Sequence, residues 1–146
     1  MHFAFLLASL AYILVSAYLS WALTRDKPIH KGISLGLLMV GMLAHAALLY
    51  PYVVTLYGLN FNLFNIISLI SLFFLFFYFL FCLYRPIVSL GILAAPTALV
   101  GLTIGYIGRA PYQPITNISI GLEAHILLSL SAYCVLLMAA VQALFL

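Results

Sequence analysis

Five long apolar runs, joined by short connections, make up nearly the whole sequence. A helix needs about 20 apolar residues to cross the roughly 30 Å of bilayer hydrocarbon, because it rises about 1.5 Å per residue. Helices are expected because each satisfies its own backbone hydrogen bonds within lipid. We predict an all-α membrane protein, a single transmembrane domain over residues 1–146 built as a bundle of five transmembrane helices. The predicted spans cover about residues 3–23, 33–52, 63–84, 87–107 and 122–146.

The charge content excludes a soluble domain. Charged residues make up 5% of the chain and hydrophobic residues 68%, whereas about a quarter of the residues in soluble proteins are charged. The net charge of +3 is too small to indicate nucleic-acid binding. No basic residue precedes the first apolar run, which favours a retained span over a secretory signal. The lipid bilayer is therefore the first predicted partner.

Basic residues divide unequally between the two ends of the predicted bundle. Arg25, Lys27, Lys31 and Arg85 lie in the first and third connections, whereas the second and fourth hold only Arg109. Cytoplasmic loops of membrane proteins carry an excess of Lys and Arg. This asymmetry predicts an N-terminus outside, with the second and fourth connections on the same outer side.

The fifth predicted span places an ionisable ring near the outer surface. His125 lies about 5 Å below the interface at 1.5 Å per residue, and Ser129 follows one turn later on the same helix face. An imidazole within a membrane is a candidate functional group, and haem iron is commonly held by a histidine nitrogen. The alternative is a histidine hydrogen-bonded to a neighbouring helix or to interfacial water. The spacing leaves both open.

A second imidazole, that of His45, lies in the second span among Ala44, Ala46 and Ala47. If this helix ends at Pro51, the ring lies about 9 Å below the outer surface. Small neighbours suit the close approach of a porphyrin or of another backbone, and a packed, hydrogen-bonded histidine is the alternative. Two histidines on the outer side of a bundle would suit a bis-ligated haem if their helices face each other.

Other patterns predict helix packing. Asn65 and Ser68 share a face of the third span, where they would join helices or line a cavity. The Gly32-x-x-x-Gly36 and Gly101-x-x-x-Gly105 motifs predict faces for close helix approach. The Phe- and Leu-rich segment 73–81 is expected to face lipid.

Several catalytic and transport functions find no support in the sequence. Asp26 lies in a connection and Glu123 at a span edge, so no carboxylate lies deep enough to relay protons for an exporter. No P-loop, Ser/His/Asp set or HExxH motif is present. Cys82 and Cys134 form no Cys-x-x-Cys motif and are expected to be small buried hydrophobes. We therefore do not predict an enzyme.

The fifth span also carries a family resemblance. Its sequence from His125 to Tyr133, His-Ile-Leu-Leu-Ser-Leu-Ser-Ala-Tyr, looks like the His-x-x-x-Ser-x-x-x-Tyr helix of the cytochrome c assembly (CcsA-type) membrane proteins. The match is closer to the small inner-membrane branch of that family. Residues 63–72 are similar to its Leu-Asn-x-x-Ser-Leu-x-Ser-Leu pattern, and His45 lies where the branch also has a histidine. The resemblance touches three of the five predicted spans.

This resemblance implies a haem-handling protein of the bacterial inner membrane that takes part in c-type cytochrome assembly. It implies a non-covalent b-type haem, with other assembly proteins as partners. Carried over, His125 is an external haem ligand, His45 is a candidate ligand within the membrane, and Ser129 adjoins the haem-binding surface. The chain departs from the family's tryptophan-rich external loop, because its only tryptophan is Trp21 in the first span.

Family members usually have about eight helices and a later partner histidine, so we expect this sequence, which stops at Leu146, to be truncated. The alternative function is a cofactor-free structural or scaffolding membrane subunit whose histidines pair helices.

Overall fold

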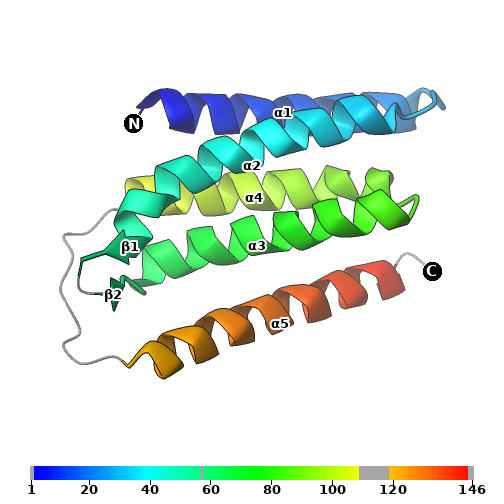
Figure 1. Ribbon diagram of the computed structural model, residues 1–146. Coiled ribbons are helices and arrows are strands. Elements are labelled where there is room, and N and C mark those ends of the chain that lie inside the picture. Colours follow the sequence, from blue (N-terminus) through cyan, green and yellow to red (C-terminus); the bar gives the residue numbers. More distant parts are fainter. Residues whose placement is uncertain (1, 57, 109–118, 145–146) are drawn as a thin grey trace.

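The computed structural model describes residues 2–56, 58–108 and 119–144 (Figure 1). These residues form five long helices, and each helical span is long and apolar enough to cross a membrane. The predicted five-helix, all-α membrane fold is therefore confirmed. The helices and strands in chain order are α1 (His2–Thr24), α2 (Lys31–Val53), β1 (Val54–Thr55), β2 (Gly58–Leu59), α3 (Leu63–Tyr84), the 3-10 turn η1 (Val88–Leu90), α4 (Gly91–Ile107) and α5 (Ile120–Leu144).

Four of the helices pack as a ring and the fifth lies outside it. Helix α1 packs against α2 and α4, and α3 packs against the same two helices. Helix α5 packs mainly along α3, on the outer side of the bundle (Figure 1). The centre of the ring is filled by side chains without solvent exposure, among them Leu38, Leu75 and Ala98. Most of the core therefore belongs to α1–α4, and α5 adds Cys134 and Met138 to it.

The helix ends follow local sequence signals. The side chain of Asn62 caps α3, because its Oδ1 accepts a hydrogen bond from the Asn65 N–H at 2.8 Å. Pro51 lies two residues before the end of α2. The second connection contains a short antiparallel hairpin in which Val54 pairs with Leu59. The fourth span begins as η1 rather than as a continuous helix from residue 87. The predicted loop around Arg109 lies outside the described residues.

Glycines bring α4 close to α3, as the Gly101-x-x-x-Gly105 motif predicts. A Cβ on Gly105 would lie 2.6 Å from the Ser68 Cβ, and one on Gly101 would overlap the Ser71 side chain. The matching prediction for Gly32-x-x-x-Gly36 is wrong. Among the described residues, nothing lies within 4 Å of a Cβ built on either glycine of that motif.

The segment 73–81 does not simply face lipid, which corrects another prediction. Phe74, Leu75 and Tyr78 are buried in the core, and Phe76 and Phe81 are exposed. The Tyr78 hydroxyl donates to the Val88 carbonyl at 2.7 Å. Because helix α3 contacts α2, α4 and α5, most of its circumference lies within the protein.

Replacing Gly105 by Leu should destabilise the bundle by about 1–3 kcal/mol, because a side chain would collide with Ser68 on α3. Thermal unfolding of the detergent-solubilised protein would measure the effect. Gly32→Leu is the matched control, since its new side chain enters open space. Equal melting temperatures for the two variants would contradict this account of α3–α4 packing.

Candidate functional site

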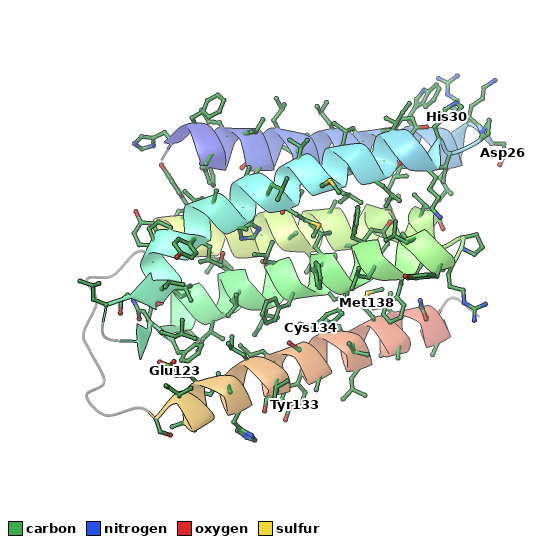
Figure 2. All side chains as sticks on the ribbon, in the orientation of Figure 1. Asp26, His30, Glu123, Tyr133, Cys134 and Met138 are labelled. Carbon is green, nitrogen blue, oxygen red and sulfur yellow. The ribbon has the colours of Figure 1, made fainter. Side chains whose placement is uncertain are left out.

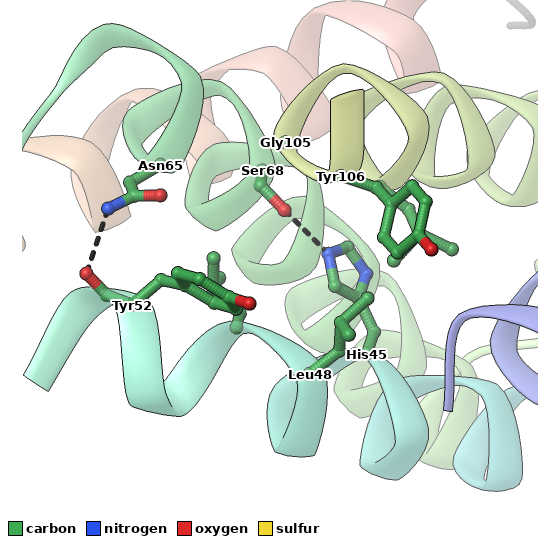
Figure 3. Close-up of a pocket in the computed structure, with 9 residues that line it drawn as sticks. His45, Leu48, Tyr52, Asn65, Ser68, Gly105 and Tyr106 are labelled. Carbon is green, nitrogen blue, oxygen red and sulfur yellow. Dashed lines mark hydrogen bonds between the residues drawn. The ribbon is translucent and has the colours of Figure 1, made fainter. Parts of the chain in front are cut away.

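His45 on α2 is a polar side chain in the membrane core with no solvent exposure. Its Nδ1 lies 3.2 Å from the Tyr12 hydroxyl on α1. Its Nε2 lies 2.9 Å from the Ser68 hydroxyl on α3, and Figure 3 shows the ring directed at that serine. One imidazole therefore joins three helices.

The two hydroxyl partners suit a neutral imidazole. In the neutral ring one nitrogen donates a hydrogen bond and the other accepts one, whereas a hydroxyl can do either. Tyr12 and Ser68 can therefore satisfy both ring nitrogens in either tautomer. Gly41 makes this possible on α2, because a Cβ there would lie 2.6 Å from Cε1 of the Tyr12 ring. The sequence left His45 as a haem ligand or a packed histidine, and its surroundings match the packed histidine.

Beside His45 lies a cavity of about 10 Å³. Its lining includes polar groups of Tyr52, Asn65 and Ser68 (Figure 3). A volume of this size holds about one water molecule, so a porphyrin does not fit beside His45 in this arrangement.

Asn65 acts as a junction between segments, as one reading of the sequence predicted. Its Nδ2 donates to the Tyr52 carbonyl at 3.0 Å and to the Asn60 carbonyl at 3.1 Å. These carbonyls belong to the end of α2 and to the segment before α3. The polar stripe of the third span therefore joins neighbouring backbone segments and also lines the small cavity.

His125 lies in the opposite kind of environment. It is exposed on α5, near the end of the bundle that carries the hairpin. Ser129 is half-buried one turn later, and Ala132 and Leu136 continue the exposed stripe. None of the described residues hydrogen-bonds to the His125 ring. This imidazole is therefore sterically accessible from outside the bundle.

The structure does not bring the two candidate ligands together. His45 is enclosed among α1–α4, whereas α5 lies beyond α3 and presents His125 away from the ring of helices. A single iron held by both, the arrangement considered from the sequence, is not formed. Ser129 stays with His125, as the spacing predicted.

Glu123 fixes the start of α5. Its Oε1 accepts a hydrogen bond from the Leu59 N–H at 2.7 Å, so the first turn of α5 is tied to strand β2 (Figure 2). Gly58 permits this contact, because it has a φ of 115° and a Cβ there would lie 2.5 Å from that oxygen. The sequence indicated only a favourable carboxylate in the first turn of a helix. The tie to the hairpin went unpredicted.

Further along α5, Cys134 and Met138 point towards α3, while Tyr133 points away (Figure 2). The Cys134 thiol contacts the Ile70 carbonyl at 3.5 Å. Cys82 is also buried and unbridged. Both cysteines are thus small buried groups, as predicted. No cluster of three or more His, Cys, Asp or Glu side chains occurs in the part of the chain that the structure describes.

Tyr12 is the site residue that sequence reasoning missed. It is fully buried, and its ring packs edge-on to that of His45. The available signal was a tyrosine in the middle of an apolar span, since a buried Tyr hydroxyl usually finds a partner. The identity of its partner, His45, depends on how the helices are arranged, which the sequence does not show.

Comparison with protein families, curated proteins and solved structures found no match to this chain.

The Tyr12–His45 hydrogen bond should appear as coupling in a double-mutant cycle. We expect Tyr12→Phe to lower the free energy of unfolding less in the His45→Leu background than in the parent, by about 1 kcal/mol. Unfolding in mixed detergent micelles would measure the four variants. Strictly additive effects would show that the two side chains do not stabilise each other.

Glu123→Ala should release the start of α5 from the hairpin. The Leu59 amide would lose its acceptor and exchange its proton for deuterium faster, while amides in the middle of α3 keep their rates. Hydrogen–deuterium exchange read by mass spectrometry measures both regions. Glu123→Gln is the control because it keeps an oxygen acceptor, and exchange as fast as in the alanine variant would argue against the contact.

Proposed function

We propose that this protein is a membrane subunit that binds or passes b-type haem during c-type cytochrome assembly, with His125 as an axial ligand. The observation that carries the proposal is the position of His125, exposed on the outer face of α5 and next to Ser129. An imidazole in a membrane helix usually has a bound partner or a functional role. The resemblance of the fifth span to the CcsA-type helix gives the same assignment.

In this proposal the chain supplies ligation and a low-dielectric surface. Bound haem would supply the redox chemistry of its iron. The His125 imidazole would donate one ring nitrogen, and the exposed Ala132 and Leu136 would leave room for the flat macrocycle. Ser129 would offer a hydroxyl at the edge of that surface.

A second axial ligand would come from outside the described residues or from a partner protein, because His45 is already enclosed. This division assigns the two histidines different tasks. His45 holds α1, α2 and α3 together, and His125 meets the cofactor.

The proposal includes an orientation and a location. Arg25, Lys27, Lys31 and Arg85 lie at one end of the bundle and His125 lies towards the other. With the basic end in the cytoplasm, the N-terminus and His125 would face the outer side of a bacterial inner membrane, where c-type cytochromes are assembled.

A second candidate function is a cofactor-free structural or scaffolding subunit. The observation that favours it is the pair of hydrogen bonds at His45, which account for that imidazole without any ligand. Under this function His125 would contact another protein helix. The two candidates differ in whether the purified protein binds haem.

Haemin titration of the purified full chain tests the first proposal. We expect a Soret band that saturates near one haem per chain, and we expect His125→Ala to lose most of it. The measurement is the absorbance titration, accompanied by the melting temperature without haem. Ser129→Ala should weaken the band less, because its hydroxyl is not an iron ligand.

His30→Ala is the matched control, since it removes an exposed histidine from the opposite end of the bundle. A haemin titration without a saturable change in the Soret band would overturn haem binding and favour the scaffolding function. A full Soret band in the His125→Ala variant would overturn the assignment of the ligand.

A further inference from the structure

An apolar groove separates α2 from α3 over part of their length. The two helices meet near the hairpin and diverge towards the opposite end of the bundle (Figure 1). The groove has a volume of about 410 Å³, within the roughly 300–1,000 Å³ of typical ligand pockets. It is lined only by apolar side chains, those of Met39, Met42, Leu43, Ala46, Leu72, Phe73, Phe76 and Phe79.

Two basic residues lie beyond this α2–α3 groove, at the end of the bundle away from the hairpin. Lys31 begins α2, and its ammonium reaches across to the end of α3, where Nζ donates to the Leu83 carbonyl at 3.1 Å. Arg85 follows α3 directly and is exposed. At about 1.5 Å per residue, Lys31 lies about 12 Å along its helix from Met39, and Arg85 about 9 Å along the chain from Phe79. Lys31 therefore lies between the same two helices, α2 and α3, that form the groove.

The ammonium of Lys31 keeps capacity for a ligand. An ammonium group has three N–H donors, and one of them is directed at the Leu83 carbonyl. Among the described residues, the only acidic side chain in the two connections at this end is Asp26, which belongs to the turn between α1 and α2. The end of the groove is thus suited to an anionic group.

Two glycines leave the surface of α2 uncovered between the groove and the Lys31 ammonium. Gly32 and Gly36 share a helix face with Met39 and Leu43, given 100° of rotation per residue. No described atom of another helix lies within 4 Å of a Cβ built on either glycine. The Gly32-x-x-x-Gly36 motif does not bring two helices together. It therefore leaves the surface of α2 uncovered between the groove and Lys31.

We propose that the α2–α3 groove binds one anionic phospholipid, with an acyl chain along the apolar lining and the phosphate at Lys31 and Arg85. Hydrocarbon suits the lining because no polar group there would be left unpaired. Basic groups between transmembrane helices are known to hold anionic head groups. This inference is independent of the haem proposal, since the groove lies between α2 and α3, away from the exposed face of α5.

Native mass spectrometry of the full chain in a neutral detergent tests the proposal. The protein is stripped of lipid and titrated with phosphatidylglycerol or with phosphatidylcholine of the same acyl chains. We expect one phosphatidylglycerol to bind with preference over phosphatidylcholine. Lys31→Gln and Arg85→Gln should each weaken that binding about fivefold, the effect of one basic group near a membrane surface.

Two further variants separate the parts of the site. Lys27→Gln is the charge-matched control at the same end of the bundle, and it should leave phosphatidylglycerol binding nearly unchanged. Gly36→Leu should weaken binding by filling the open surface, and its melting temperature without lipid should match that of the parent. This variant therefore tests whether the lipid needs the open surface of α2, without disturbing the fold.

Four outcomes would overturn the proposal. Equal binding of the two phospholipids would indicate ordinary surrounding lipid. Equal losses in Lys27→Gln and Lys31→Gln would indicate a diffuse charge effect. Displacement of the lipid by inorganic phosphate alone would show that the groove adds nothing. A lipid-free dimer would mean that a second copy covers this face.

Discussion

The absence of water in the bilayer core is the constraint on which the rest of this structure depends. Each polar group in a span must find its partner within the protein. Several serine and threonine hydroxyls do so locally, as when Ser16 donates to the Tyr12 carbonyl and Thr103 to the Leu99 carbonyl. The buried Ser9 hydroxyl is an exception, because it has no hydrogen-bond partner among the described residues. The His45 ring instead pairs with groups of two other helices, the Tyr12 hydroxyl on α1 and the Ser68 hydroxyl on α3. Its hydrogen bonds thereby help to set how α1, α2 and α3 lie relative to one another.

The sequence predicted the number and approximate limits of the spans because apolar length alone decides whether a helix crosses a bilayer. It also predicted a close-approach face on α4, since a pair of glycines one turn apart permits close approach, but it did not identify α3 as the helix that packs there. The same reasoning failed for Gly32 and Gly36. Small residues allow a contact, but the neighbouring helix must also be directed at them.

The candidate site was predicted as residue types and not as an arrangement. His45, His125 and Ser129 were found because polar groups are conspicuous in apolar spans. The partnership of Tyr12 with His45, the tie between Glu123 and Leu59, and the outer position of α5 were not found. Lipid tails are as apolar as leucine, so hydrophobicity does not distinguish a core face from a lipid-facing one. A uniformly apolar sequence therefore does not predict how each helix is rotated about its axis or which helices it packs against.

The attachment of α5 differs from that of the other helices, because it rests mainly on α3 and on one hydrogen bond to strand β2. Only a narrow strip of α5, including Cys134 and Met138, is buried. Detaching this helix would expose the core surface that Cys134 and Met138 cover and would break the hydrogen bond at its start, while α1–α4 keep their contacts with one another. Among the described helices, α5 therefore has the smallest interface with the others, so its loss would cost the bundle less buried surface than the loss of any other helix.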